Sequence, residues 1–354
     1  MTARNSLWLL VVILVSAAVG FVGRGLLEGK WDQKGGATGK PAFDFIVGGP
    51  DPFWNQVIAG AEAAADELDV DLHVHIPSGV PADQTKVLAQ LEGVASQGVA
   101  ISPIAPDEQT RLLSRMAAKT LVVTFDNDAP QSLRHCYVGT NNYLAGRDCA
   151  KVVEEGLPEG GNVVIFIGDK ERQNAQDRLR GFHDRIVGLE QPAEDSEFPL
   201  DDPYGSDNIK VLGIYFDGQS PDQAATNVRQ ALEEHPDVDC MVGLYGYNGP
   251  ACLKVLRDSE DPKDIKIVAF DEHEETLDGV ASGDILATVV QSSFQYGYET
   301  VRLLKTWSNS GEHFGPLEGT GYRYLPCKIV TKENVAEHRA NLARRLSGRE
   351  AATK

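Results

Sequence analysis

Cysteine and positive charge are both scarce in this sequence. Five cysteines occur among 354 residues, and no two of them have CxxC spacing, so neither a zinc site nor a thioredoxin-like motif is indicated. An odd number leaves at least one thiol free, and we expect most of the five to be buried and unbridged, because a free cysteine packs as a small hydrophobe. Lys and Arg total 33 against 52 Asp and Glu, a formal charge of −19, without a dense basic run. Since nucleic-acid binding needs a concentrated positive field, the composition argues against a nucleic-acid partner.

The residue sets that enzymes use are also missing from the sequence. Asp126 and Asp271 could at best form a general acid–base pair, but no nucleophile, metal set or phosphate loop accompanies them. His73 and His75 share one face of a predicted strand, yet no third ligand lies at a useful spacing, so a solvated or partly packed strand face is favoured over a metal site. We therefore expect no catalytic residues, no metal and no cofactor, and a protein that is not an enzyme.

One long hydrophobic run stands near the N-terminus. Arg4 precedes the run Leu7–Gly23, an order typical of a secretory signal. The run has 17 residues, which is at the short limit for a bilayer span, so an uncleaved membrane anchor is the alternative. A buried core helix is disfavoured because a soluble helix seldom lacks a polar face. We expect residues 1–24 to be a signal peptide or anchor, residues 25–41 a flexible tether, and the remainder an exported, periplasmic protein.

Strand and helix patterns alternate along the rest of the chain, and a length prior of about 150 residues per domain suggests two domains. In the first half we expect strands at Phe43–Gly48, Leu72–Ile76, Val99–Ser102 and Leu121–Phe125, with helices at Phe53–Leu68, Asp83–Gln97 and Pro106–Lys119. In the second half we expect strands at Asn162–Ile167, Val211–Phe216, Cys240–Tyr245, Lys266–Phe270 and Ile285–Gln291, with helices at Asn142–Glu155, Ala175–Ile186, Ala224–Glu234 and Gly249–Asp258. This rhythm predicts an α/β fold of two doubly wound lobes, each a parallel sheet with helices on both faces. The segment Leu189–Asn208 is predicted to be a surface insertion.

Polar and aromatic side chains follow several of these strands. In such sheets ligands bind beyond the carboxyl ends of the strands. The candidate binding residues at these positions are Phe53, Trp54, Asp126, Asn127, Asn174, Gln176, Arg178, Tyr245, Asn248, Asp271 and Gln291. Planar carboxylates and amides pair with neighbouring hydroxyls, while an aromatic face covers the C–H side of a sugar ring. The set therefore predicts a neutral, polyhydroxylated ligand.

Structural roles remain open for each of these candidates. An Asp after a strand is often a turn or cap residue, and at least one of Phe53 and Trp54 is expected in the core. Arg178 is expected to order the start of its helix or to tie two faces together more than to touch ligand. Only the joint pattern favours binding.

Six stretches in fixed order carry a family resemblance. They are FIVGGPDPFWNQVIAGAEAAADEL, VVTFDNDAP with YVGTNNYLAGRDCAKVV, NAQDRLRGF, NVRQALEEHPDVDCMVGLYGYNGPACLKVL, IKIVAFDE and GDILATVVQSSFQYGYETVRLL. From Phe43 to about Val335 the chain resembles the sugar-binding periplasmic proteins of ABC importers, of the ribose-binding type. These proteins share their fold with the effector domains of LacI-type repressors, but residues 1–41 cannot form a DNA-binding headpiece.

The resemblance implies roles for the candidate residues. It assigns ring stacking to Phe53 and Trp54, hydroxyl binding to Asp126 with Asn127 beside it, a polar contact to Asn174 or Gln176, a ligand position to Tyr245 with Asn248 nearby, and further contacts to Asp271 and Gln291. Asn127 stands where ribose binders typically have Arg. Departures at Asn127, Gln176 and Tyr245 remove two positive side chains, which argues against ribose itself and favours another neutral sugar or polyol.

The resemblance also implies how the two lobes connect. It predicts crossings near Thr140-Asn141, Gln291-Ser292 and Tyr322–Pro326, so that residues 42–140 plus 292–322 form one lobe and residues 141–291 plus 323–340 the other. Residues 341–354 are expected to be a frayed basic tail. The lobes would close around the ligand by a hinge motion.

These expectations lead to two hypotheses for function. The first is an exported, monomeric solute-binding protein that captures a monosaccharide or polyol and delivers it to an ABC permease. The alternative is a sugar-sensing module that Leu7–Gly23 anchors in the membrane and that signals occupancy to a receptor.

Overall fold

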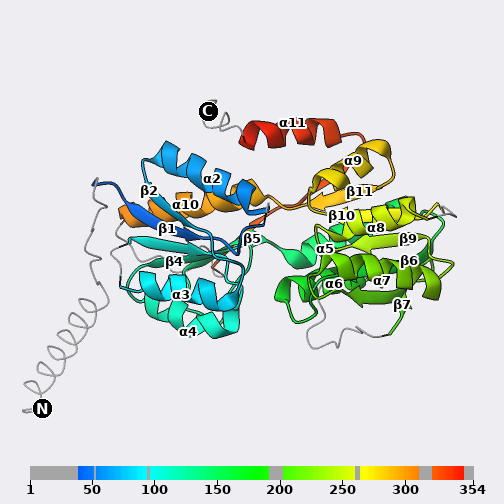
Figure 1. Cartoon of the computed structure of the whole chain (residues 1–354), viewed down its shortest axis with the longest axis horizontal. Coiled ribbons are helices and arrows are strands. Elements are labelled where there is room, and N and C mark those ends of the chain that lie inside the picture. Colours follow the sequence, from blue (N-terminus) through cyan, green and yellow to red (C-terminus); the bar gives the residue numbers. More distant parts are fainter. Residues whose placement is uncertain are drawn as a thin grey trace, which may run out of the picture.

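The protein is described by a computed structural model that covers residues 39–51, 53–93, 96–190, 202–259, 264–310 and 321–346. Two β-sheets, each with helices packed on it, lie side by side along the long axis of the molecule (Figure 1). The predicted signal or anchor Leu7–Gly23, most of the tether and residues 191–201 of the predicted insertion lie outside the described residues. Within the described ranges, no helix has both the length and the apolar character that crossing a bilayer requires.

The first lobe is built on a six-stranded sheet with the strand order β12-β5-β4-β3-β1-β2. Its strands, which are all parallel to their neighbours, are β1 (Ala42–Ile46), β2 (Asp71–His75), β3 (Gly98–Ile101), β4 (Leu121–Phe125), β5 (Cys136–Thr140) and β12 (Tyr322–Leu325). The helices α2 (Phe53–Leu68) and α10 (Ser293–Ser310) cover one face, and α3 (Pro81–Leu91) and α4 (Pro106–Ala117) cover the other. Strands β1, β3, β4 and β5 are buried along their whole length, which explains their apolar sequences.

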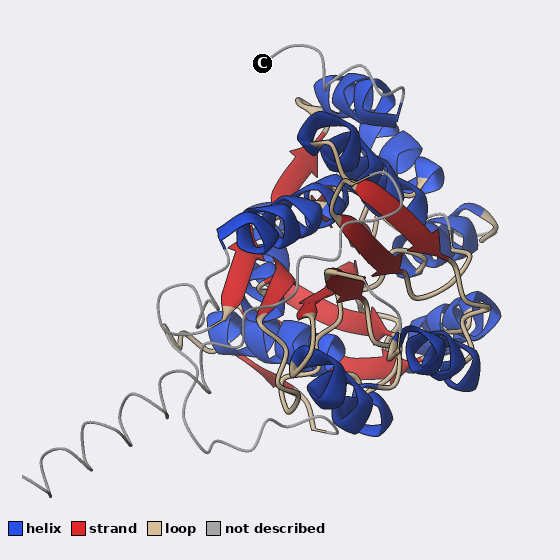
Figure 2. Cartoon of the chain, turned by 90° about the vertical axis from the view of Figure 1, so that its left-hand side faces the viewer, coloured by secondary structure: helices blue, strands red, loops and turns tan. Residues whose placement is uncertain are grey.

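The second lobe is built on a seven-stranded sheet with the order β13-β11-β10-β9-β6-β8-β7. The strands are β6 (Gly161–Ile167), β7 (Tyr204–Gly205), β8 (Ile209–Phe216), β9 (Cys240–Gly243), β10 (Lys266–Phe270), β11 (Ala287–Val290) and β13 (Lys328–Thr331). Only the outer strands β7 and β13 run antiparallel to their neighbours among these seven. The helices α5 (Asn142–Gly156) and α6 (Gln173–Ile186) cover one face, and α7 (Pro221–Glu234), α8 (Asn248–Arg257) and α9 (Glu274–Ser282) cover the other. The view along the molecule shows strands enclosed by helices (Figure 2), so the predicted α/β fold is confirmed.

Helix pairs approach closely in both lobes because glycines stand at the contacts. A Cβ atom on Gly60 of α2 would lie 1.9 Å from the carbonyl oxygen of Phe294 on α10. A Cβ atom on Gly146 of α5 would likewise lie 1.9 Å from the carbonyl oxygen of Arg178 on α6. Any larger residue at either position would push the two backbones apart.

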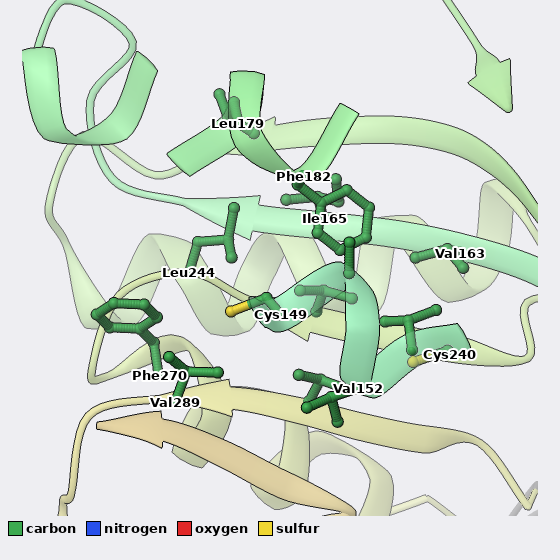
Figure 3. Packing of buried hydrophobic residues seen from close by; sticks show 14 of the residues in the cluster. Cys149, Val152, Val163, Ile165, Leu179, Phe182, Cys240, Leu244, Phe270 and Val289 are labelled. Atoms are coloured by element: carbon green, nitrogen blue, oxygen red, sulfur yellow. The ribbon is translucent and has the colours of Figure 1, made fainter. Parts of the chain in front are cut away.

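The expectation that most of the cysteines are buried and unbridged is confirmed. Cys136, Cys149, Cys240 and Cys252 are buried and Cys327 is half-buried, without a disulfide among the five. Cys149 and Cys240 lie among apolar side chains between α5, α6 and the second sheet (Figure 3). Burial raises the pKa of the Cys240 thiol to about 12, so this thiol stays protonated and unreactive at neutral pH.

Three chain crossings connect the lobes. They lie between β5 and α5, between β11 and α10, and between β12 and β13. The Ser292 hydroxyl donates to the carbonyl oxygen of Pro326 at 2.8 Å, which ties the second crossing to the third. The Thr140 hydroxyl at the first crossing bonds the hydroxyl of Tyr296 in α10. The crossings are thus cross-linked by side chains.

Three predicted boundaries are wrong. Strand β12 pairs with β5 of the first sheet, from Tyr322 with Tyr137 to Leu325 with Thr140, so the third crossing lies at Pro326-Cys327 and residues 323–325 belong to the first lobe. The predicted frayed tail begins too early, because α11 (Val335–Leu346) is a helix packed against α2 and α9. The predicted helix Asp83–Gln97 is the shorter α3, which starts at Pro81 and ends at Leu91.

Candidate ligand-binding cleft

A cavity of about 820 Å³ lies between the two lobes at the carboxyl ends of their strands. Nine of the eleven predicted binding residues line it: Phe53, Trp54, Asp126, Asn127, Asn174, Arg178, Tyr245, Asp271 and Gln291. The cavity draws on both lobes, since residues from the loops after β1 and β4 face residues from α6 and from the loops after β9 and β10. Its size is within the range of small-molecule sites, roughly 300–1,000 Å³.

The structure does not bring the other two predicted residues to the cavity. Gln176 is exposed on α6, and its side-chain amide donates to the carbonyl oxygen of Lys170 at 2.9 Å. Asn248 is buried at the start of α8. Its side chain accepts from the Tyr245 backbone N–H at 3.0 Å and donates to Asp217 at 2.8 Å. Both side chains therefore organise neighbouring backbone and side-chain groups instead of facing the cleft.

Two aspartates occupy equivalent positions in the two lobes. Asp126 directly follows β4 and Asp271 directly follows β10, with φ angles of 60° and 61°. Asp tolerates this left-handed conformation better than most residues, although a non-glycine residue there still costs roughly 1–3 kcal/mol. Each backbone N–H is bonded to a neighbouring strand, Asp126 to the Val138 carbonyl at 3.0 Å and Asp271 to the Val289 carbonyl at 2.9 Å. The two turns hold both carboxylates at the floor of the cavity.

Neutral groups surround the first-lobe carboxylate. The Ser102 hydroxyl donates to Asp126 at 3.3 Å and the Asn127 amide donates at 3.1 Å. Burial raises the pKa of Asp126 to about 7, against the opposing pull of the Arg178 guanidinium and with a further push upward from Asp271. Asp126 is thus poised to exchange a proton near neutral pH.

The second-lobe carboxylate has closer polar partners. The Gln291 amide donates to both oxygens of Asp271, at 3.0 and 3.2 Å. Burial raises the pKa of Asp271, while the positive charge of Arg178 and the Gln291 hydrogen bond pull it down. Gln291 also accepts from the Tyr296 hydroxyl at 3.1 Å, which joins this carboxylate to the helix that follows the second crossing.

Arg178 lines the cavity and also ties several elements together. Its side chain is 4% exposed, and it donates to the Asn142 side chain at 2.9 Å, to the Leu244 carbonyl at 2.8 Å and to Gln291 at 3.2 Å. The guanidinium lies 3.9 Å from the centre of the Phe270 ring, a favourable cation–π geometry. The structure therefore gives Arg178 the tying role that the sequence suggests and also exposes it to the cavity.

Aromatic rings form walls of the cavity in both lobes. Trp54 is only 9% exposed and packs in the core of the first lobe, with its ring edge-on to Phe125. Phe53 is half-buried beside it, with ring centroids 5.0 Å apart at 82°. In the second lobe the Tyr245 hydroxyl donates to the Asn174 side chain at 2.9 Å. Phe53 and Tyr245 thus offer ring surface to the cavity, and Trp54 supports Phe53 from the core.

The cavity lining also includes residues outside the predicted set, among them Arg172, Tyr247 and Gln219. Arg172 precedes α6 and donates across the cleft to the Ile104 carbonyl of the first lobe at 2.9 Å. The Tyr247 hydroxyl donates to Asp217 at 2.5 Å, and Gln219 lies at the same end of the cavity. Tyr247 lies two residues after the end of the predicted strand Cys240–Tyr245, and Asp217 directly follows β8. Both therefore occupy positions at the ends of strands, where the sequence analysis places ligand-binding residues. Arg172 follows a turn and carries no comparable signal.

The described residues hold no group of three or more His, Cys, Asp and Glu side chains arranged for a metal ion. His75 Nε2 lies 2.7 Å from Asp44 Oδ1, and His73 Nδ1 lies 3.7 Å from the same oxygen. The two histidines therefore share one buried carboxylate on the neighbouring strand β1.

Two α/β lobes with a polar cleft between them define a class of binding proteins that enclose their ligand by hinge motion. The profile of the family described as periplasmic binding protein domain matches residues 45–312. The chain belongs to this family, and the resemblance noted from its motifs is confirmed.

Several named proteins are similar to this chain. The D-apiose import binding protein of Paraburkholderia graminis is 25% identical over 201 residues, which span 56% of this chain and 56% of that protein. The ribose import binding protein of Haemophilus influenzae is 24% identical over 245 residues, or 68% of this chain and 76% of that protein. The crystal structure of a glucose-galactose binding protein from Geobacillus stearothermophilus is 26% identical, with a TM-score of 0.71, and the match covers 83% of this chain and 98% of that one. The matched stretch thus spans just over half the length of the apiose-binding relative.

Proposed function

We propose that the protein binds a neutral monosaccharide or related polyol in the cleft and delivers it to an ABC permease. One observation carries the proposal: two carboxylates, Asp126 and Asp271, lie at matching strand ends of the two lobes and face one cavity. The sugars in the names of the similar proteins support the same ligand class.

The cavity contains the groups that such a ligand needs. Asp126 and Asp271 would accept hydrogen bonds from sugar hydroxyls on opposite sides of the ring. The side-chain amides of Asn127 and Gln291 would form further hydrogen bonds with the same hydroxyls. The ring of Phe53 would cover the apolar side of the sugar. Closure of the lobes would then remove water, which strengthens each of these bonds. No covalent step is part of this proposal.

The charge of the lining supports a ligand without negative charge. Six carboxylates line the cavity, from Asp51, Asp126, Asp271, Glu272, Glu274 and Glu275, whereas its arginines are Arg172 and Arg178. Both guanidiniums already donate to protein oxygens. A sugar phosphate or sugar acid would add a like charge to this lining, and an unpaired like charge in a closed site is strongly unfavourable.

Export follows from the same proposal. The run Leu7–Gly23 with Arg4 before it is typical of a secretory signal, and the acidic composition suits a soluble exported monomer. We propose a periplasmic location, in line with the family.

A thermal-shift panel tests the ligand class. The purified protein is heated with neutral pentoses, hexoses and polyols, and with matched sugar acids and sugar phosphates. A ligand that binds only the folded state at 100 times its Kd adds about 2.7 kcal/mol of stability, which raises Tm by several degrees. We expect this rise with one or a few neutral compounds and none with the anionic ones. Absence of any rise with neutral compounds, or rises confined to anions, would refute the proposal.

A further inference from the structure

The C-terminal helix α11 contacts both lobes. It follows β13, which belongs to the second sheet, and it packs against α9 of the second lobe and α2 of the first. Figure 1 shows it lying across the molecule above these two helices. The helix is separate from the three chain crossings, so it adds a noncovalent connection between the lobes.

Most of α11, from Val335 to Leu342, is held by the second lobe. Val335 is buried and Leu342 packs against the same apolar cluster. His338 is only 7% exposed, and its ring bonds the carboxylate of Glu272. Arg339 reaches two carboxylates of α9, Glu274 at 3.3 Å and Asp278 at 2.6 Å. These contacts anchor the helix to the segment that follows β10.

The last turn of α11 reaches the first lobe. The guanidinium of Arg345 lies 5.6 Å from the centre of the Phe294 ring at the start of α10. Phe294 is 5% exposed and stacks on Tyr298 of the same helix. A cation over a buried aromatic ring is attractive and needs no fixed donor geometry. The far end of α11 therefore rests on a rigid part of the first lobe.

Both contact points adjoin the candidate ligand site. Glu272 follows Asp271 in the chain and lines the cavity itself, and Glu274 also lines it. On the other lobe, Phe294 follows Ser293, which lines the cavity too. A change in the distance between the lobes would strain the helix at one end or the other, next to groups that face the ligand.

We propose that α11 is a strap that restrains opening of the lobes and couples their separation to the segment Asp271–Glu275. Opening must break the Arg345–Phe294 contact, and closing restores it. Because the contact is weak, the strap shifts the balance between open and closed forms without locking either. A less populated closed form lowers the apparent affinity in proportion, so the strap would also tighten binding of the ligand class proposed above.

The lobe separation of the ligand-free full chain tests the strap independently of any sugar. Arg345→Gln removes the contact with Phe294, and Arg344→Gln is its matched control. Arg344 is the preceding residue of the same turn, is exposed, and bonds Asn341 within α11. We expect small-angle X-ray scattering to give a larger radius of gyration for Arg345→Gln than for the native chain, and no change for Arg344→Gln. Equal radii for the native chain and Arg345→Gln would overturn the proposal.

A double-mutant cycle links the effect to the two named side chains. Phe294→Leu keeps an apolar side chain but removes the ring. We expect Phe294→Leu and Arg345→Gln each to expand the ligand-free chain, and the double variant to expand it no further, because the two changes remove one interaction. Additive expansion would contradict the Arg345–Phe294 contact as the strap's attachment.

The anchored end of the strap gives a second, separate readout. His338→Leu removes the bond to Glu272, whereas His338→Gln keeps a side-chain donor. For a neutral sugar found by the thermal-shift panel, we expect His338→Leu and Arg345→Gln to raise Kd by about threefold, the scale of one weak contact, and His338→Gln to restore native affinity. If no sugar binds, the proposed function fails while the scattering result still decides the strap. A native Kd for both His338→Leu and Arg345→Gln would refute the coupling to the ligand site.

Discussion

The two lobes place the same group in the same backbone geometry but surround it differently. Asp126 and Asp271 each follow a central strand with a φ near 60°. Ser102 and Asn127 each donate one hydrogen bond to the first-lobe carboxylate, whereas Gln291 donates to both oxygens of the second-lobe carboxylate. The charge of Arg178 lowers the pKa of both carboxyls. Both arginines of the cavity lining, Arg172 and Arg178, belong to the second lobe. The sheet therefore positions each carboxylate, and the neighbouring side chains set its pKa.

Removing Arg178, the cation that both aspartates share, should have the largest effect on stability. Arg178→Met leaves Asp126 and Asp271 without their positive neighbour and raises the pKa of both carboxyls, because Arg178 lowers each pKa in the native chain. Loss of one partner from a buried charge cluster costs about 3–5 kcal/mol. We expect the free energy of unfolding at pH 7, measured with urea, to fall by this amount.

Arg111→Met is the control for that variant. Arg111 is exposed on α4 and does not line the cavity, and exposed substitutions usually change stability by less than about 0.5 kcal/mol. If Arg178→Met unfolded at the same urea concentration as Arg111→Met, Arg178 would not be the charge that balances the two aspartates.

Gly146→Ala and Gly60→Ala test whether the two helix contacts are equivalent. Each new methyl group would meet a carbonyl oxygen 1.9 Å away, and overpacking of this kind costs about 1–3 kcal/mol. We expect a lower free energy of unfolding for both variants. Because Gly146 faces the carbonyl of Arg178, Gly146→Ala should also weaken ligand binding, which isothermal titration would measure.

Gly93→Ala provides the matched control, since no atom lies within 4 Å of the position that its Cβ would take. A native Kd for Gly146→Ala, alongside its loss of stability, would show that Arg178 is positioned independently of the α5–α6 contact.

The pH dependence of the free energy of unfolding should separate the two aspartates. The pKa of Asp126 is raised from 3.8 to about 7 in the folded chain, so the folded state holds a proton that the unfolded state releases between these values. Stability therefore falls as pH rises from about 4 to about 7. We expect Asp126→Asn to flatten this fall in the ligand-free protein, measured by urea unfolding at three pH values across this window at constant salt.

Asp271→Asn is the comparison in the other lobe. The pKa of Asp271 is raised too, but two hydrogen bonds from the Gln291 amide oppose the rise, so we expect Asp271→Asn to flatten the curve less than Asp126→Asn does. A curve for Asp126→Asn parallel to that of the native chain would contradict the burial of an ionisable Asp126.

Several buried strands of the fold were predictable from the sequence, but β5, which is also buried, and the half-exposed β12 were not. Strands such as β4 and β9 are buried throughout and therefore appear as short apolar runs. Strand β12 is mostly half-exposed, so it has no such run, and its partner β5 lies far away in the sequence. For this reason the third crossing was predicted too early. The stability of α11 depends on His338, Arg339 and Arg345 contacts with distant residues, which no local pattern reports.

Most residues of the candidate site were also predictable from the sequence, and a few were not. Reading the ends of strands located nine cavity residues, because parallel strands present their carboxyl ends at one edge of the sheet. This reasoning failed where the position of a residue around a helix axis determines whether its side chain faces the cavity. Asn174 and Arg178 are four residues apart and share a face of α6, but Gln176 lies about 200° around the axis from Asn174 and faces solvent. Asn248 failed because its side chain turns back to its own loop.

By itself, the sequence determined the two-lobed α/β architecture, the burial of most cysteines, and the strand ends at which the cleft lies. Periodicity and burial are local properties, so residue order is enough to specify them. Only the tertiary structure decided which strand-end side chains face the cavity, how Arg178 divides its charge between two carboxylates, and that α11 reaches from one lobe to the other. Those properties depend on distances between residues far apart in the chain, and such distances exist only once the lobes are folded and packed.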